Sequence, residues 1–496
     1  MRFSKKDYFE LKQSLNEILL SEKADDFKFN VPFLFLNREH PVFLNKYLSL
    51  EKGRKIFFKK SVPHILYKLM VSLFSLKNKV FYLKMPSKVD FLFISHFTNI
   101  NQLEGHSDPY YGTLVNSMRE NNFNCLVVKI NHTRFRGNYE VGENGVLNDF
   151  IIPKTTTFFQ ELKFLHIAYL GLKKLVRITF KNNLQRNIFT YLKYAIYSNQ
   201  TIGILRFSYI IKKIIERTNP TFVISTFEGH AYERQIFRMS KKINPNITNI
   251  AYQHSIISKY ANTINLKFPN EHFNPDVILC MGDSSYNFFK KTSVFQNLPM
   301  YILGSSKANN SPIISFSSKH KKSSCLIVPE GIYSECMHLL NLSVHCAQLL
   351  PSVQFYFRLH PIMQLKEIIR KNSHRMEFPK NLIFSKSTLM EDISCSSWVV
   401  YRGSTAVFNA IEQGLRPIYL KIIGEEMTID PLQGLSIGKR IIEKGEDLVE
   451  IIAHDIKLDF KEYDEYQKRY LTYIKNQYSN LDPKVLIDIG NNSNLK

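Results

Sequence analysis

The sequence WVVYRGSTAVFNAIEQGLRPIYL constrains the fold of this chain more than any other stretch. It opens with Trp398–Tyr401, a continuous apolar run that is typical of a buried parallel strand. A helix-length segment follows, in which Val407, Ala410 and Ile411 share one helical face. Pro417–Leu420 then has the pattern of a second strand. A strand, a helix and a strand in this order predict one unit of a parallel α/β sheet.

Three small residues, Gly403, Ser404 and Thr405, stand where the first strand meets the helix. In such a unit the helix N-terminus lies at the carboxyl ends of the strands, where unpaired backbone N–H groups and the helix dipole attract an anion. A glycine lets the backbone approach a ligand closely, and the two hydroxyls can donate to phosphate oxygens. The same tripeptide is also a good ordinary helix N-cap. Other residues of the sequence are needed to distinguish a phosphate-binding site from an N-cap.

The alternation of strand and helix continues through most of the chain. Lys307–Lys322 interrupts it with a polar tract rich in Ser, Asn and Lys, which is typical of a linker. We therefore expect an α/β protein with two tandem Rossmann-like domains that face a cleft, and with a helical N-terminal extension. The expected strands are Val89–Ile94, Cys125–Val128, Thr221–Ser225, Thr248–Tyr252 and Val277–Cys280 in the first domain, and Cys325–Val328, Val353–Leu359, Leu382–Ser385, Trp398–Tyr401 and Pro417–Leu420 in the second.

These patterns also predict segment boundaries. The expected segments are a basic helical N-terminal extension at 1–87, a first Rossmann-like domain with a basic helical insertion at 88–303, a linker at 304–322, a second Rossmann-like domain at 323–460, and a C-terminal helix and tail at 461–496.

The composition fits a globular chain with sizeable cores, because 44% of its 496 residues are hydrophobic and 13% are aromatic. A formal net charge of +23 draws the surface toward polyanions, namely phosphorylated ligands, anionic lipid headgroups or nucleic acid. The six cysteines contain no C-x-x-C pair, so we expect reduced thiols and neither a disulfide framework nor a zinc site.

The N-terminal sequence MRFSKKDYFELKQSLNEILL is too charged for the apolar core of a signal peptide, and no apolar run reaches the length of a membrane span. We therefore expect a cytoplasmic protein. Basic residues flank apolar ones in the N-terminal extension and in the mid-chain helices, which predicts peripheral binding to an anionic membrane surface. The alternative is an ordinary amphipathic helix packed on the body of the protein.

Polar clusters in the second domain follow three predicted strands. Because carboxyl ends of parallel strands meet at one edge of a sheet, we expect these clusters to line a single ligand crevice. His and Arg supply charge there, and the helix N-terminus supplies donors for phosphate oxygens. The expected substrate-binding residues are Glu330, Gly331, Arg358, His360, Arg402, Gly403, Ser404 and Thr405.

In the first domain, polar residues again follow the strands, and transfer to a hydroxyl acceptor needs a general base. The candidates for this catalytic role are Glu228, Asp108 and His254. Glu228 and nearby Glu233 could instead be helix N-terminal residues that interact with the helix dipole, a role that suits Glu233 equally well, and His254 could simply form a hydrogen bond across a loop.

The order R-L-H-P, then V-V-Y-R-G-S-T-A-V-F-N-A-I-E-Q-G-L-R-P-I-Y-L, then I-D-P-L resembles the C-terminal half of GT-B glycosyltransferases that make bacterial surface carbohydrates. The nearest resemblance is to an uncharacterised family of that group. More distant resemblances are to bacterial sialyltransferases and Kdo transferases, with their His-Pro and Ser/Thr motifs, and to teichoic-acid polymerases. F-E-G-H-A-Y-E-R and Y-Q-H-S resemble the E-x-x-x-x-E and Q-H elements of the first family. The resemblance covers about residues 88 to 450.

The resemblance implies that the second domain binds the donor nucleotide and faces a first domain that binds the acceptor. It also implies roles for single residues of the second domain. His360 with Ser404 and Thr405 would hold the nucleotide phosphate, and Glu330 with Gly331 would line the base or ribose pocket. Many GT-B enzymes carry a ribose-binding Glu in the helix that follows, where this chain has Asn409, also a substrate-binding candidate.

The leading interpretation is a metal-independent glycosyltransferase without a cofactor, acting in capsule or lipopolysaccharide biosynthesis. Its partners would be a nucleotide-sugar donor and a saccharide or lipid-linked acceptor. The resemblance favours a CMP-linked sugar as the donor. One alternative is transfer of a glycerol- or ribitol-phosphate unit, as in teichoic-acid synthesis. Another is a non-catalytic polyanion-binding protein, although the chain has no motif for specific nucleic-acid recognition.

Overall fold

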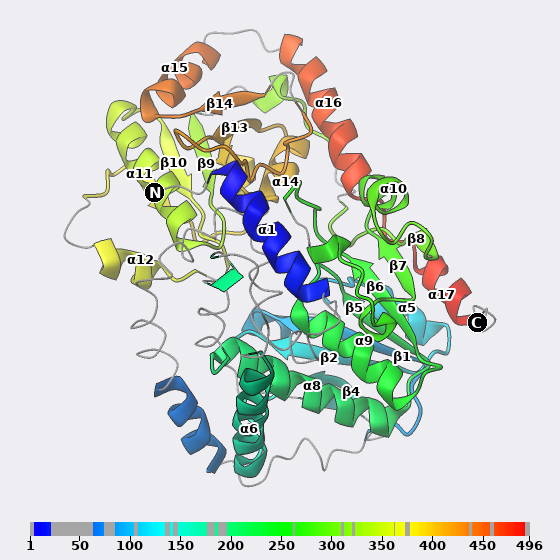
Figure 1. Ribbon diagram of the computed structural model, residues 1–496. Coiled ribbons are helices and arrows are strands. Elements are labelled where there is room, and N and C mark those ends of the chain that lie inside the picture. The colour runs from blue at the N-terminus through cyan, green and yellow to red at the C-terminus, as the bar shows by residue number, and fades with distance from the viewer. Residues whose placement is uncertain are drawn as a thin grey trace. The chain divides into compact units, whose positions relative to one another are not determined.

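The computed structural model divides the chain into two compact units, each with its own parallel sheet (Figure 1). Unit 1 combines Met1–Lys307 with Tyr478–Lys496, and unit 2 is Ala308–Gln477. The structure describes residues 4–20, 63–73, 85–103, 108–133, 139–141, 147–175, 183, 185–186, 196–260, 263–308, 312–319, 323–361, 363–372, 377–435, 439–456 and 461–491. Most of the basic extension expected at 1–87, and part of the basic mid-chain region, lie outside these residues.

The described residues of unit 1 form a sheet of eight strands in the order β3-β4-β2-β1-β5-β6-β7-β8, and every neighbouring pair is parallel except β3 with β4. Its central strands are buried on both faces, which explains their continuous apolar runs. The strands are β1 (Phe91–Phe97), β2 (Cys125–Asn131), β3 (Tyr139–Val141), β4 (Leu147–Ile151), β5 (Phe222–Thr226), β6 (Thr248–Gln253), β7 (Val277–Cys280) and β8 (Met300–Ile302).

Helices flank this sheet, and the two ends of α8 (Asn199–Thr218) show why the chain turns where it does. Ser198 caps α8 through its side chain, and Asn219 ends that helix in the left-handed conformation. The helices of unit 1 are α1 (Lys5–Leu20), residues 63–73, α5 (Leu114–Glu120), α6 (Phe158–Leu175), α8 (Asn199–Thr218), α9 (Ala231–Ile243), α10 (Asp283–Thr292) and α17 (Pro483–Asn491), with short 3₁₀ turns η3 (Ile100–Leu103), η4 (Thr263–Asn265) and η5 (Glu271–Phe273).

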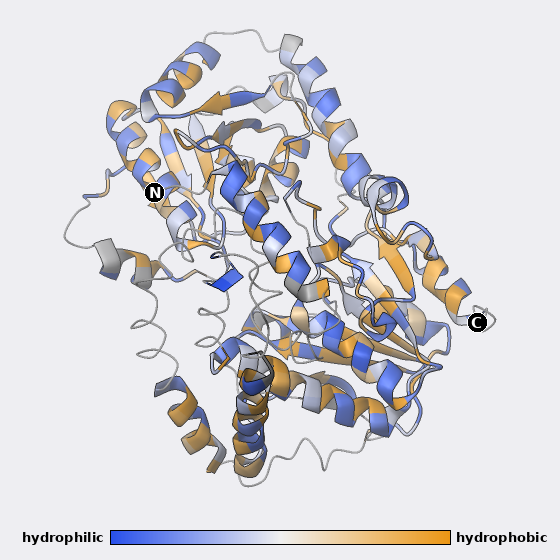
Figure 2. Ribbon diagram, in the orientation of Figure 1, coloured by the Kyte–Doolittle hydropathy of each residue, from blue (hydrophilic) through white to orange (hydrophobic). Residues whose placement is uncertain are grey.

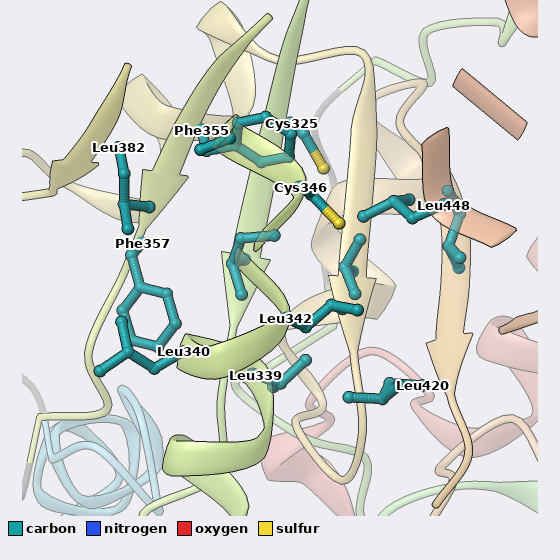
Figure 3. Close-up of a cluster of buried hydrophobic side chains, with 14 of the residues drawn as sticks. Cys325, Leu339, Leu340, Leu342, Cys346, Phe355, Phe357, Leu382, Leu420 and Leu448 are labelled. Atoms are coloured by element: carbon teal, nitrogen blue, oxygen red, sulfur yellow. The ribbon is translucent and has the colours of Figure 1, made fainter. Parts of the chain in front are cut away.

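In unit 2, the part of the chain that the structure describes forms a sheet of six parallel strands in the order β11-β10-β9-β12-β13-β14. In Figure 3, Leu339, Leu342 and Cys346 from α11 lie among strand residues such as Phe355 and Leu420, in one buried apolar core. The strands are β9 (Ser324–Val328), β10 (Gln354–Phe357), β11 (Leu382–Phe384), β12 (Trp398–Tyr401), β13 (Arg416–Leu420) and β14 (Arg440–Ile442). The helices are η6 (Ser317–Lys319), α11 (Tyr333–Leu349), α12 (Leu365–Asn372), α13 (Leu389–Cys395), α14 (Ala406–Glu412), α15 (Gly445–Asp455) and α16 (Lys461–Gln477).

The last helices of the chain belong to different units. In α16, the Gln467 side chain donates to the carbonyl of Ile411 at 2.9 Å within unit 2. In α17, Leu486 and Ile489 are buried in the core of unit 1, together with Phe91. We did not predict from the sequence that the C-terminus returns to the first unit.

Both sheets have the strand order of a Rossmann fold. With the strands of unit 2 numbered along the chain, the order is 3-2-1-4-5-6, and unit 1 has the same order with the short antiparallel β3 and the edge strand β8 added. The expected α/β fold of two tandem Rossmann-like units is therefore confirmed. In each sheet the strand order reverses at one point, between the parallel neighbours β1 and β5 in unit 1 and between the parallel neighbours β9 and β12 in unit 2. Ligands of such sheets bind outside the carboxyl ends of the strands at that point.

Candidate functional site

A buried histidine marks the point of reversal in unit 1. His96 lies near the carboxyl end of β1, and its Nε2 is 2.9 Å from Thr226 Oγ1 on the neighbouring β5. The same nitrogen is 3.2 Å from the Tyr232 hydroxyl, and its Nδ1 is 2.8 Å from His132 Nε2. Burial, and then the neighbouring His132, hold the pKa of His96 well below its usual value. His96 is therefore a neutral hydrogen-bonding group that joins several elements at this edge of the sheet.

Glu228, a predicted catalytic residue, lies beside it in the loop after β5. Its side chain is half-buried, with Oε2 3.0 Å from His230 Nε2 and Oε1 3.6 Å from His254 Nε2. Gly229 makes this geometry possible, because its φ of +83° favours glycine and a Cβ there would meet the Thr263 carbonyl carbon at 2.4 Å. The loop thus places one carboxylate within reach of two imidazoles.

The second carboxylate of this loop has a different environment. Glu233 is fully buried and accepts hydrogen bonds from the backbone N–H of Glu228, at 3.0 Å, and of His230, at 2.7 Å. It forms a capping box at the start of α9. Burial, and then the charge of Glu228, raise the pKa of Glu233 to about 8. Glu233 therefore holds the backbone on which Glu228 and His230 stand.

Asp108, another predicted catalytic residue, is an anchor for the loop that follows β1. Its Oδ1 accepts hydrogen bonds from Ser95 Oγ at 2.8 Å and from the Tyr110 backbone N–H at 2.9 Å. Burial raises the pKa of the Asp108 carboxyl. The Tyr110 ring lies 4.9 Å from the His96 ring and 5.0 Å from the His254 ring, measured between centroids. Asp108 thus positions the Tyr110 ring against His96 and His254, whereas Glu228 is the carboxylate that reaches His230 and His254.

At the point of reversal in unit 2, the loops after β9 and β12 touch. A Cβ on Gly403 would lie 2.8 Å from both Cγ and Oε1 of Glu330. Glycine is therefore required at 403 for Glu330 to keep its place. Burial raises the pKa of the Glu330 carboxyl, and the Gly331 backbone N–H, which hydrogen-bonds to it, opposes this shift.

The two hydroxyl residues that follow are half-buried at the start of α14. Thr405 occupies the N-cap position, yet its side chain makes no capping hydrogen bond. The Ser404 hydroxyl is only 3.4 Å from the backbone nitrogen of Ala406, which is a long contact. The Ser-Thr pair is therefore not an ordinary side-chain N-cap. Asn409, one turn into the helix, is also half-buried.

The loop after β10 carries Arg358 and His360 to the same edge of the sheet, because β10 pairs with β9. Arg358 donates from Nη1 to the Ser387 carbonyl at 2.6 Å and to Asp392 Oδ2 at 2.8 Å, so it holds the start of α13. His360 is half-buried, and burial lowers the pKa of its imidazole.

Arg402 is not exposed at this edge. It is 1% exposed and donates to Glu335 from Nε, to Glu425 Oε1 from Nη2 at 3.0 Å, and to the Leu420 carbonyl from Nη1 at 2.7 Å. The Coulombic attraction of Glu335 and the hydrogen bond to Glu425 outweigh the desolvation cost and raise the pKa of Arg402. We therefore assign this residue a positioning role beneath the loop instead of the ligand contact expected from the sequence.

The group around His96 in unit 1 also contains two residues that we did not predict from the sequence, namely Tyr110 and His132. Both follow buried strands in chain order, which is the signal that could have found them. Among the described residues, no three His, Cys, Asp or Glu side chains are arranged to hold a metal ion. No helix in the described part of the chain is long and apolar enough to cross a membrane.

No model of a known protein family matches the sequence, and no curated protein matches it. Solved structures with some similarity include the α,α-trehalose 6-phosphate synthase of Burkholderia multivorans, with 8% identity, a TM-score of 0.46, and coverage of 82% of this chain and 96% of that one. Another is the UDP-GlcNAc 2-epimerase of Neisseria meningitidis bound to UDP-GlcNAc, with 12% identity, a TM-score of 0.44, and coverage of 81% and 99%. A third is the glycosyltransferase SnogD of Streptomyces nogalater, with 11% identity, a TM-score of 0.42, and coverage of 81% and 99%. At such low identities and TM-scores these similarities decide neither family nor activity, and the fold assignment rests on the strand orders.

Proposed function

We propose that the protein is a GT-B-type glycosyltransferase that moves a sugar from a nucleotide-activated donor to a hydroxyl of a saccharide or lipid-linked acceptor. The observation that carries the proposal is a group of polar and titratable side chains at the carboxyl edge of the sheet in each Rossmann-like unit. Unit 1 has a carboxylate beside two imidazoles, and unit 2 has a loop of hydroxyls after β12 and a half-buried histidine after β10, at the same edge of its sheet. The resemblance of the R-L-H-P and R-G-S-T motifs to surface-carbohydrate glycosyltransferases adds capsule or lipopolysaccharide synthesis as the process.

Unit 2 is the proposed donor site. The hydroxyls of Ser404 and Thr405 would donate to the nucleotide phosphates, and Glu330 would contact the ribose or base. His360, whose pKa is lowered by burial, would serve as a neutral hydrogen-bond donor to the leaving phosphate. The resemblance favours CMP-linked sugars as donors. Many GT-B enzymes carry a ribose-binding Glu where this chain has Asn409, so the identity of the nucleotide is the first question for a nucleotide screen.

Unit 1 is the proposed acceptor site. Glu228 would accept the proton of the acceptor hydroxyl as that oxygen bonds to the anomeric carbon of the sugar. The bond from the anomeric carbon to the phosphate oxygen breaks as this new bond forms, and the nucleotide leaves with that electron pair. His230 and His254 would orient the carboxylate, and the protein groups alone would stabilise the charges.

A screen of ligands tests this function directly. Thermal-shift measurements with free nucleotides and nucleotide-sugars should show stabilisation by one nucleotide class. Hydrolysis assays should then show turnover of a nucleotide-sugar. Turnover of a CDP-alditol in its place would support transfer of a glycerol- or ribitol-phosphate unit. Salt-dependent binding to generic oligonucleotides without any nucleotide-sugar binding would leave only a polyanion-binding protein.

His360→Ala is expected to slow transfer by about two orders of magnitude, the scale known for loss of one electrostatic donor at a reacting oxygen. The steady-state rate with saturating donor measures this. His345→Ala is the matched control, because His345 is an exposed histidine of unit 2 and pairs with exposed Glu446. Equal rates for the two variants would contradict the role of His360.

Replacing Ser404 and Thr405 together with Ala is expected to weaken nucleotide binding by about tenfold, because each hydroxyl supplies a hydrogen bond to a charged oxygen. Isothermal titration with the nucleotide identified by the screen measures the dissociation constant. Because Thr405 makes no capping hydrogen bond, the melting temperature should stay close to that of the unmodified protein. A large drop in melting temperature with unchanged affinity would show that the pair has only a structural role.

A further inference from the structure

The helix at residues 63–73 of unit 1 is apolar on its outer side, while its inner side mixes apolar residues, Ile65 and Leu69, with polar ones. Its Lys68 side chain turns inward and donates to the Lys154 carbonyl at 3.1 Å, and its Ser72 is fully buried. A surface helix of a globular protein ordinarily turns such residues to solvent and buries its apolar stripe. Here the outward side chains are apolar, and the exposed fractions are 55% for Leu66, 61% for Tyr67, 59% for Met70 and 44% for Leu73.

Helix α6 also presents an apolar outer face, now mixed with basic residues. Its inner side is packed, with Phe164 and Ala168 buried. Its outer side repeats at helical spacing and consists of Phe159, Leu162, Lys163, His166, Tyr169, Leu170 and Lys173, all exposed, with Phe159 at 82%. Lys173 Nζ lies 4.7 Å from the centre of the Tyr169 ring, so charge and aromatic surface are adjacent on this face.

The two helices pack together. Residues His64 and Lys68 of the first helix line a cavity with Glu161 and Leu165 of α6 and with Arg206 of α8. In Figure 1 the helix at 63–73 lies beside α6, and in Figure 2 the ribbons of both helices include many hydrophobic residues, coloured orange. Their outer apolar residues therefore belong to neighbouring parts of one unit, and we call them the two-helix face.

Charge on the two-helix face has one sign. Glu161 is the sole carboxylate in the sequence of these two helices, and it is buried in a double hydrogen bond with Arg206, at 2.7 Å from both Nε and Nη2. Attraction between the paired charges, opposing desolvation, lowers the pKa of Glu161. The charged side chains that remain exposed on the face, Lys163 and Lys173, are cationic.

We propose that the two-helix face is a docking surface for an anionic lipid bilayer. The outward Leu, Met and Phe side chains would enter the boundary between headgroups and acyl chains, the tyrosines would lie at the headgroup level, and the lysines would contact anionic headgroups. A second copy of the chain is a poorer occupant, because two surfaces of a protein with net charge +23 repel each other, whereas an anionic membrane attracts this face. The surface does not depend on the proposed reaction, since binding to vesicles can be measured without donor or acceptor.

The test is flotation of the full chain with vesicles of phosphatidylcholine alone or mixed with phosphatidylglycerol, at low and high salt. We expect recovery with the anionic vesicles, less with the neutral ones, and a decrease at high salt. Two double variants, L66E/M70E and F159E/L170E, should each lower the partition coefficient by about tenfold or more, because each removes apolar side chains and adds negative charge. These positions are exposed, so both variants should keep the melting temperature.

The matched control is a double variant at exposed apolar residues elsewhere, V294E/I423E, with exposed fractions of 53% and 62% at those positions. It adds the same charge and should float as the unmodified chain does. Equal recovery with neutral and anionic vesicles would overturn the proposal, as would undiminished flotation of both two-helix variants. Sedimentation analysis showing an oligomer that these variants dissociate would assign the face to a second copy of the chain and also overturn it.

Discussion

Replacing Glu228 with Gln is expected to lower the rate of sugar transfer by about two to four orders of magnitude and to leave nucleotide binding and the melting temperature nearly unchanged. Gln keeps the size and a hydrogen-bond acceptor of Glu but cannot take up the proton of the acceptor hydroxyl. Its amide still fits the site between His230 and His254, because the carboxylate is half-buried and the loop backbone is held by Glu233. Single-turnover rates with excess donor would report the chemical step.

Two further variants make the result specific. Glu120→Gln removes an exposed carboxylate from α5 of the same unit and should be neutral. Asp108→Asn is expected to lower stability and activity together, since Asp108 anchors the loop that carries Tyr110. If Glu228→Gln retained full activity while Asp108→Asn lost it without any loss of stability, Asp108 would be the base and the proposed role of Glu228 would be wrong.

The sequence was sufficient to predict the fold because parallel strands buried on both faces appear as continuous apolar runs. β1 and β12 are examples, with every residue buried. The strands that we did not predict are β3, β4, β8 and β14. β3, β8 and β14 have only three residues each and lie at sheet edges, and β14 exposes part of its surface. Short edge strands carry too few residues for their periodicity to be distinguished from that of a loop.

The sequence also located the candidate loops, because the position of a residue after a strand fixes the edge of the sheet on which it lies. It could not rank residues within a loop. Asp108 and Glu228 are both carboxylates that follow strands, and only their hydrogen bonds separate an anchor from a group beside two imidazoles. Likewise Arg402 adjoins the hydroxyl loop in sequence, but its acidic partners, Glu335 and Glu425, lie 67 and 23 residues away. Such long-range pairing leaves no local pattern.

The pairing of Arg402 leads to a large expected effect on stability. Arg402→Met should destabilise unit 2 by about 3–5 kcal/mol, because it leaves two carboxylates without their buried cation. The chain has a single tryptophan, Trp398, which is buried in β12 of the same unit. Its fluorescence during urea unfolding therefore reports on unit 2 separately from the rest of the chain.

The carboxylates themselves supply the decisive control. Adding Glu335→Gln and Glu425→Gln to Arg402→Met removes the unpaired negative charge and should restore a substantial part of the lost stability, because neutral groups cost less to bury than charges. Lys380→Met, which removes an exposed cation from unit 2, should change stability by less than about 0.5 kcal/mol. If Arg402→Met kept full stability and lost only nucleotide binding, Arg402 would contact the donor directly, and the buried ion pairs would not be what holds this loop in place.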